Sequence, residues 1–141
     1  VGANFNGLNL HRVILEDRDL HEATFINTDL RGAILANSNF NNCSFLGASL
    51  ITAFLINSTF KGANLYGCRA FGCNFTGADL TEANFSEADL LNADLSKSNL
   101  CGAIMSCKNI ETVIFTDAVY DSATKWPKSF NPERAGCRKV D

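Results

Sequence analysis

An apolar residue stands at every fifth position of this chain, and that period limits the possible folds more than any other feature of the sequence. The series runs unbroken from Phe5 to Phe115, and 20 of its 23 members are Leu or Phe. An α-helix repeats every 3.6 residues and a β-strand every two, so a period of five fits neither element alone. It fits a chain that turns a corner after every five residues.

A small residue, mostly Ala, Ser, Cys, Thr or Val, stands two positions before nearly every large apolar residue, and only Leu8, Arg18 and Lys108 break this pattern. Side chains two residues apart on an extended segment point to the same side, so both should face a core, and the residue between them should face outward. Glycine recurs two positions after the large residue, as at Gly62, Gly67, Gly72 and Gly77. A corner residue with positive φ would explain that preference.

The outward residue of most repeats is Asn or Asp, as in the stretch Ala78-Asp79-Leu80-Thr81-Glu82-Ala83-Asn84-Phe85. Such stretches, which cover residues 3–120, resemble the tandem consensus of pentapeptide-repeat proteins. The resemblance implies an all-β fold: a right-handed quadrilateral β-helix with four repeats per coil. Over residues 1–120 this gives about six coils and, at the usual strand spacing of ~4.8 Å, a rod roughly 30 Å long.

The repeat fades after Tyr120, and residues 121–141 are predicted to form a short helical cap on the last coil. Asn131 is suited to begin a helical turn and Gly136 to end it. Trp126 and Phe130 would supply the apolar side chains that cover the core. The alternative is a disordered tail, which seldom carries Trp and Phe so close together.

The chain has six cysteines, and the repeat divides them into two groups. The small inward position is held by Cys43, Cys68 and Cys73. Cys101, Cys107 and Cys137 lie outside that position. We predict a disulfide between Cys107 and Cys137, with Cys101–Cys137 as the alternative, because the polar tail that carries Cys137 should fold back onto the last coil. Such a bond would indicate an oxidising compartment.

No catalytic site, metal site or cofactor is predicted, because the polar residues follow the repeat and not a catalytic motif. His11 and His21 each follow a large inward residue, so they should point outward on separate sides. No C-x-x-C pair and no phosphate-binding glycine loop occur. The sequence therefore indicates neither an enzyme nor a small-molecule substrate.

Charge and hydropathy limit the possible partners. The net charge is −3 at pH 7, whereas nucleic-acid binding needs clustered Lys and Arg, so we predict no nucleic-acid partner. No run of 18 apolar residues is present, and we predict no membrane span.

One side of the predicted coil carries apolar residues at outward positions, where polar ones are expected. This candidate interaction patch consists of Ile34, Ile51, Phe54, Ile56, Phe71 and Leu91. Contiguous exposed apolar surface commonly marks a binding site for another protein. The alternative is that β-branched and aromatic residues simply suit extended segments.

The sequence thus predicts a non-enzymatic structural or protein-interaction module with an unidentified protein partner. The segments Tyr120–Pro127 and Phe130–Gly136 resemble the C-terminal ends of family members from photosynthetic organisms. This implies the chloroplast thylakoid lumen, or alternatively a cyanobacterial lumen or periplasm. Two other functions stay open: a DNA mimic that binds topoisomerase, as in fluoroquinolone-resistance members, and thiol-redox regulation. The modest charge and length argue against the DNA mimic.

Overall fold

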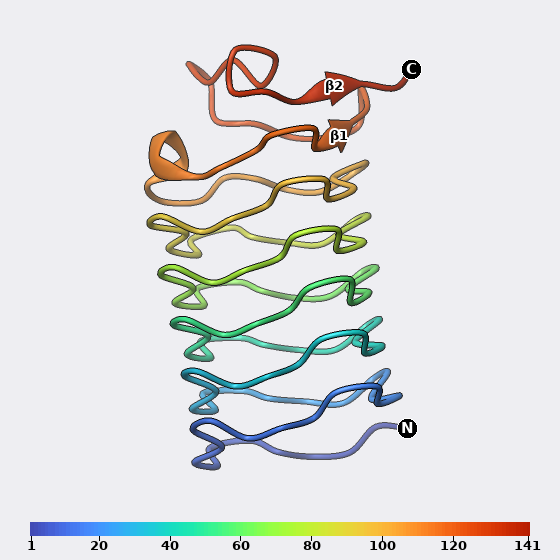
Figure 1. Cartoon of the computed structure of the whole chain (residues 1–141), viewed down its shortest axis with the longest axis vertical. Helices are drawn as coiled ribbons and strands as arrows, with labels where there is room; N and C mark the ends of the chain where they lie inside the picture. Colours follow the sequence, from blue (N-terminus) through green and yellow to red (C-terminus); the bar gives the residue numbers. More distant parts are fainter.

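The structure is a computed structural model of all 141 residues, and it forms a rod of stacked coils (Figure 1). The N-terminus lies at the lower end of the rod and the C-terminus at the upper end. Parallel bridges join residues twenty positions apart, beginning with Asn4↔Thr24 and recurring at every fifth residue to Asn84↔Ile104. One coil therefore takes twenty residues and has four faces. The predicted all-β solenoid is confirmed.

Regular secondary structure is sparse because each face contributes one bridging residue between two turns. The 3₁₀ helix η1 spans Ile110–Thr112, and the strands β1 and β2 span Val119–Tyr120 and Arg138–Lys139. β1 and β2 pair in parallel near the upper end of the rod (Figure 1). None of the helical structure is long and apolar enough to cross a membrane.

The faces are numbered here by the large inward residue of the first coil: Phe5 on the first face, Leu10 on the second, Leu15 on the third and Leu20 on the fourth. From the second coil upward the inward Leu and Phe side chains are buried. On the first face, Phe5, Phe25 and Phe45 stack with ring centroids 4.9 and 4.8 Å apart. The first coil is covered from one side only, and its large side chains are partly buried.

Every corner from Gly2 to Gly102 has a residue with φ between 54° and 70°, which confirms the positive φ predicted from the glycines. Most corners close with a hydrogen bond from the N–H of the fourth turn residue to the carbonyl of the first, such as Val13 N to Leu10 O at 3.0 Å. A positive φ at the third residue is what a type II turn requires. Non-glycine residues, among them Arg12 and Lys97, also adopt this conformation.

The outward Asn and Asp side chains hold the corners in place. Asn64 Oδ1 accepts a hydrogen bond from the N–H of Tyr66 at 3.0 Å, and Asp79 Oδ1 accepts one from Thr81 N at 3.0 Å. The same bond, two residues along the chain, recurs at Asn4, Asn9, Asp29, Asn39, Asn74, Asn84, Asp89, Asp94 and Asn99. Short Asx side chains make this local bond readily, which accounts for their place in the repeat.

The register shifts by one residue in the sixth coil. Asp89 pairs with Lys108, nineteen positions on, whereas Asp94 pairs with Ile114, twenty positions on. One residue is therefore missing before Lys108 and is regained in η1. Cys107 takes the small inward position that a strict period assigns to Lys108, and it packs against the core. The prediction that Cys107 lies outside the inward positions is wrong for this reason.

Residues 121–141 contain no regular helix, and the helical part of the cap is a single turn in which Ala135 N bonds to Asn131 O at 3.2 Å. The capping bond expected at Asn131 is present, with Arg134 N donating to Asn131 Oδ1 at 3.1 Å. The chain makes a single turn, which ends at Gly136, a residue with a φ of 103°. The chain then leaves the turn because Arg138 N bonds to the carbonyl of Ala118 at 2.8 Å, in the coil below.

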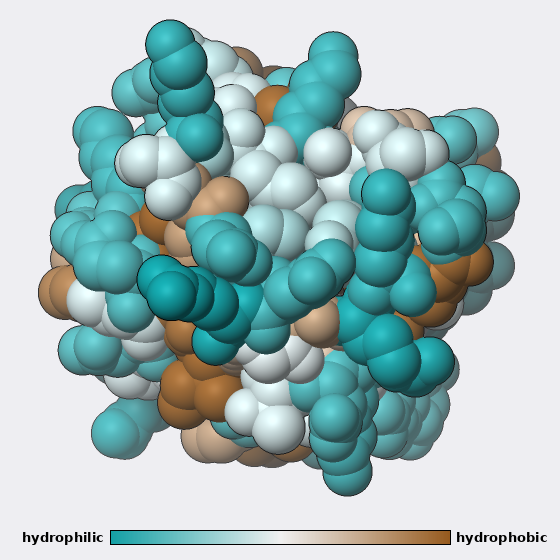
Figure 2. All heavy atoms as spheres, turned by 90° about the horizontal axis from the view of Figure 1, so that it is seen from above, coloured by the Kyte–Doolittle hydropathy of each residue, from teal (hydrophilic) through white to brown (hydrophobic).

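This terminal segment continues the stack above the sixth coil. Lys125 pairs with Ile104, and β2 pairs with β1. Trp126 packs against Phe115 and Phe130, with ring centroids 5.6 and 5.2 Å apart, so the aromatic residues cover the core as expected. Seen from above, the end of the rod is largely hydrophilic (Figure 2).

Candidate protein-interaction surface

Apolar side chains form an outward column on the third face. Parallel bridges place Ile14, Ile34 and Phe54 directly above one another in three successive coils. Ile14 is 65% exposed and Phe54 46% exposed. The next two positions of the column are Asn74 and Asp94, so the continuous apolar part covers the first three coils; the column ends at Ile114, which is 48% exposed and stands apart from it.

The corner between the second and third faces extends this column. Thr52 N bonds to Phe71 O at 2.8 Å and Gly72 N to Leu91 O at 2.9 Å, so the corner residues of successive coils lie side by side. The apolar residues at this corner, Ile51, Phe71 and Leu91, are partly exposed. The third-face patch, as we call it, consists of Ile14, Ile34, Ile51, Phe54, Ile56, Phe71 and Leu91. It contains all six residues of the candidate patch, and its role in binding stays a prediction.

A polar pocket of about 330 Å³ lies on the second face beside this patch. It is lined by Asn27, Thr28, Asp29, Arg31, Gly47, Ser49, Ile51 and Arg69. The Arg31 guanidinium donates from Nε and Nη2 to the two carboxylate oxygens of Asp29, at 2.9 and 2.8 Å. These hydrogen bonds lower the pKa of Asp29 to about 2.

This pocket was not predicted from the sequence. Its floor includes Ser49, an outward residue that is nevertheless only 4% exposed, and whose hydroxyl has no hydrogen-bond partner. The residues come from three coils, and their sequence spacing follows the repeat like that of any other outward column. The one signal available was the pair of cationic residues, Arg31 and Arg69, near one face.

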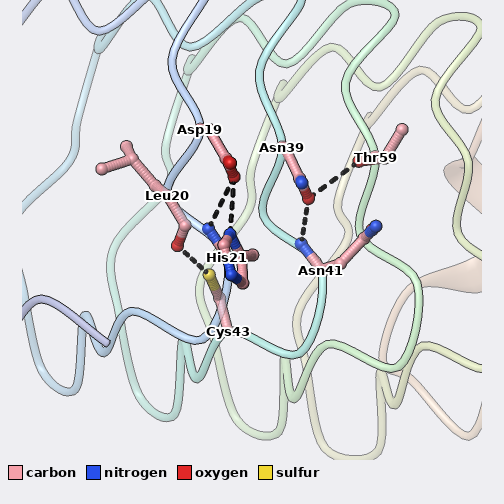
Figure 3. A network of polar contacts seen from close by, with 7 residues as sticks. All are labelled: Asp19, Leu20, His21, Asn39, Asn41, Cys43 and Thr59. Carbon is pink, nitrogen blue, oxygen red and sulfur yellow. Dashed lines mark hydrogen bonds and ion pairs between the residues drawn. The ribbon is translucent and has the colours of Figure 1, made fainter. Parts of the chain in front are cut away.

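Asp19 and His21 form a close polar pair on the surface (Figure 3). Asp19 Oδ1 lies 2.7 Å from His21 Nδ1, and this hydrogen bond lowers the pKa of Asp19. Cys43 donates from Sγ to the carbonyl of Leu20 at 3.0 Å, and its burial raises the pKa of the thiol to about 11. The thiol is therefore neutral and directed to the backbone, which does not suit a nucleophile. His, Cys, Asp and Glu side chains form no group of three that could hold a metal ion.

The family model for pentapeptide repeats matches residues 19–55, 34–77 and 71–106, with eight copies. These matches together cover residues 19–106, more than half of the chain. The chain belongs to the pentapeptide-repeat family. No curated protein matches the sequence.

Solved pentapeptide-repeat structures share this fold. The protein alr5209 from Nostoc PCC 7120 is 29% identical with a TM-score of 0.69, over 72% of this chain and 84% of that one. HetL from Nostoc sp. strain PCC 7120, involved in heterocyst differentiation regulation, is 25% identical with a TM-score of 0.67. The match covers 85% of this chain but 56% of HetL, so this chain spans little more than half of HetL. QnrB1, a plasmid-mediated fluoroquinolone resistance protein, is 17% identical with a TM-score of 0.62 over 89% of this chain and 76% of that one, and its likeness concerns the fold alone.

The disulfide predicted for this pentapeptide-repeat chain is not formed, since all six cysteines are free. Arg138 pairs with Val119, which places Cys137 in the small inward position above Ala118 on the fourth face. Cys107 holds the inward position on the second face, opposite. Neither Cys107–Cys137 nor Cys101–Cys137 is bonded. Cys107 and Cys137 lie on opposite faces, and Cys137 is buried at 6% exposure whereas Cys101 lies at a corner.

Burial also makes these thiols poor nucleophiles. It raises the pKa of Cys68, Cys107 and Cys137 to about 12 each. The thiolate is the reactive form of cysteine, so thiols with such pKa values stay protonated at neutral pH. Cys68, Cys107 and Cys137 are therefore not reactive thiols of the kind that thiol-redox regulation would need.

Proposed function

We propose that this pentapeptide-repeat protein is a non-enzymatic interaction module that binds another protein through the third-face patch. The observation that carries the proposal is the column Ile14, Ile34 and Phe54, which is apolar and at least partly exposed at positions where most repeats have a polar residue. Exposed apolar surface of this kind is costly in water and is typical of binding sites.

The solenoid is suited to this role because its faces are rigid. Each outward side chain stands on a backbone held by bonds to the coils above and below, such as Ile34 N to Val13 O at 2.9 Å and Leu35 N to Phe54 O at 2.8 Å. A surface that is already ordered loses little conformational entropy when a partner binds. A rigid, flat apolar face fits a partner that offers an apolar surface of its own.

The test is capture of partners by the immobilised chain, compared between two matched variants. The double variant Phe54→Ser/Phe71→Ser removes the two aromatic side chains of the patch. The control is Tyr66→Ser, which removes a side chain of similar exposure, 44%, from the corner between the first and second faces. A purified partner should bind the double variant about tenfold or more weakly, since truncating an interface aromatic costs ~2 kcal/mol. Equal binding to wild type, control and double variant would refute the proposal.

We also propose that the protein works in the thylakoid lumen. The support is the resemblance of Tyr120–Pro127 and Phe130–Gly136 to family members from photosynthetic organisms; the predicted disulfide no longer adds to it. Fractionation of thylakoids from the source organism, followed by immunoblotting, tests the location. Protein found in the soluble lumen fraction supports the proposal, and protein confined to the stroma or cytosol refutes it.

A further inference from the structure

The pocket on the second face and the third-face patch form one continuous surface. Ile51 belongs to both, because it stands at the corner where the two faces meet and also lines the pocket. Phe71 occupies the same corner one coil higher. A partner that covers the patch and extends round this corner therefore reaches the pocket.

The charges of the pocket leave one cation without a counterion. Asp29 accepts hydrogen bonds from Nε and Nη2 of Arg31. This pair is one of only two ion pairs in the chain. Arg69 has no carboxylate within ion-pair distance. Two guanidinium groups and one carboxylate give the pocket a formal charge of +1, which matches a singly charged anion.

Ser49 supplies a second, independent indication of a ligand. Its hydroxyl is buried in the pocket and makes no hydrogen bond, although buried polar groups in folded proteins are nearly always paired. A hydroxyl can donate to one oxygen of a carboxylate while a guanidinium donates to the other. Ser49 and Arg69 are adjacent in one outward column, joined by a parallel bridge.

We propose that the pocket binds a carboxylate of the partner protein, either an Asp or Glu side chain or a chain terminus, that lies next to apolar residues. Arg69 and Ser49 hold the carboxylate, and the apolar neighbours lie over Ile51 and Phe54. The inference rests on the proposed function and adds to it the chemistry of the partner: an apolar segment that carries one negative charge.

The experiment is an NMR titration of the whole chain with two peptides that differ only in charge, acetyl-Leu-Leu-Asp-amide and acetyl-Leu-Leu-Asn-amide. The Asp peptide should shift the amide signals of Ser49 and Arg69 and bind about fivefold more tightly than the Asn peptide, as expected for a charge-assisted bond at a partly exposed site. Acetyl-Leu-Leu-Ala with a free carboxyl terminus tests whether a chain terminus serves equally well.

Arg69→Gln and Ser49→Ala should each reduce the preference for the Asp peptide. The control Arg134→Gln removes an exposed guanidinium from the terminal turn and should leave the preference unchanged. Equal affinity for the Asp and Asn peptides, or no binding of either, overturns the carboxylate site. If both peptides bind equally and Phe54→Ser weakens both, the carboxylate site fails while the proposed function stands.

Discussion

At the scale of single residues, the left-handed corners decide which side chains each position accepts. Gly67 and Gly77 have nearly the same φ, 64° and 70°. A Cβ at Gly67 would meet nothing within 4 Å, whereas a Cβ at Gly77 would collide with the side-chain oxygen of Asn57 in the coil below. The same Asn and Gly pairing, twenty residues apart, occurs at Asn27 with Gly47 and at Asn42 with Gly62.

We therefore predict that Gly77→Ala destabilises the fold more than Gly67→Ala. Gly67→Ala should lower the free energy of unfolding by ~1 kcal/mol, the cost of a left-handed Ala. Gly77→Ala should cost ~0.5–1 kcal/mol more, because the exposed Asn57 side chain must rotate away from the new methyl group. Urea unfolding measures both. Adding Asn57→Gly to Gly77→Ala should remove the excess, and equal costs for the two single variants would contradict the explanation.

We predict that the contribution of the Arg31–Asp29 pair to the stability of the fold depends on pH. The hydrogen bonds from Arg31 lower the pKa of Asp29 from 3.8 to about 2 in the folded chain. Because the folded pKa lies below the unfolded one, the pair stabilises the fold above about pH 4, and this stabilisation is lost as the pH falls towards 2. The pair is partly exposed, with 52% of the Arg31 side chain and 25% of the Asp29 side chain accessible, so solvent screening should keep the effect on stability small. An NMR titration of Asp29 should show a midpoint near 2.

Two variants separate the cause of this shift. Arg31→Gln should return the midpoint of Asp29 towards 3.8, because the donor of both hydrogen bonds is lost. Arg69→Gln should leave it near 2, since Arg69 makes no bond to Asp29. A midpoint that stays near 2 without Arg31 would show that another group lowers the pKa.

At the scale of the coil, the stability of an inward position depends on having a coil on both sides. Leu50 and Leu55 are fully buried, whereas Leu10, in the same column as Leu50, is only partly buried in the first coil. We predict that Leu50→Ala and Leu55→Ala each lower the free energy of unfolding by ~2–5 kcal/mol.

Leu10→Ala is the matched comparison for this prediction. It removes the same atoms from the same column but leaves a smaller cavity, because solvent already reaches part of the site. Denaturant unfolding should therefore show a clearly smaller loss for Leu10→Ala than for Leu50→Ala. A loss below ~1 kcal/mol at both Leu50 and Leu55 would mean that these side chains do not form the core.

At the scale of the whole molecule, the rod is held together by its stacked coils and contains no covalent cross-link. We predict that the unreduced, unfolded protein has six titratable thiols. In the native state at pH 8, Ellman's reagent should modify Cys101 first, because it lies at a corner and is partly exposed, whereas Cys68, Cys73 and Cys137 are buried. Fewer than six thiols without reductant would reveal a disulfide.

Period five by itself indicated a chain that turns a corner after every five residues and the direction of most side chains, and the resemblance to the pentapeptide-repeat family implied the four-sided solenoid. A corner after every five residues lets every large residue face inward in each repeat. The corner conformation was also predictable from the glycines, and the apolar column of Ile34 and Phe54 from their place between two inward residues. These features are local to one repeat, or repeat without change from coil to coil.

Only the tertiary structure decided where Cys107 and Cys137 lie and what surrounds Ser49. A single residue is lost before Lys108 and the spacing changes again after Tyr120, and the register there is set by hydrogen bonds to the coil below, such as Arg138 N to Ala118 O. The pocket likewise depends on how side chains from three coils fill the space above Ser49. The register at these cysteines and the shape of the pocket both depend on side-chain and backbone contacts between neighbouring coils. The order of residues within one repeat does not specify those contacts.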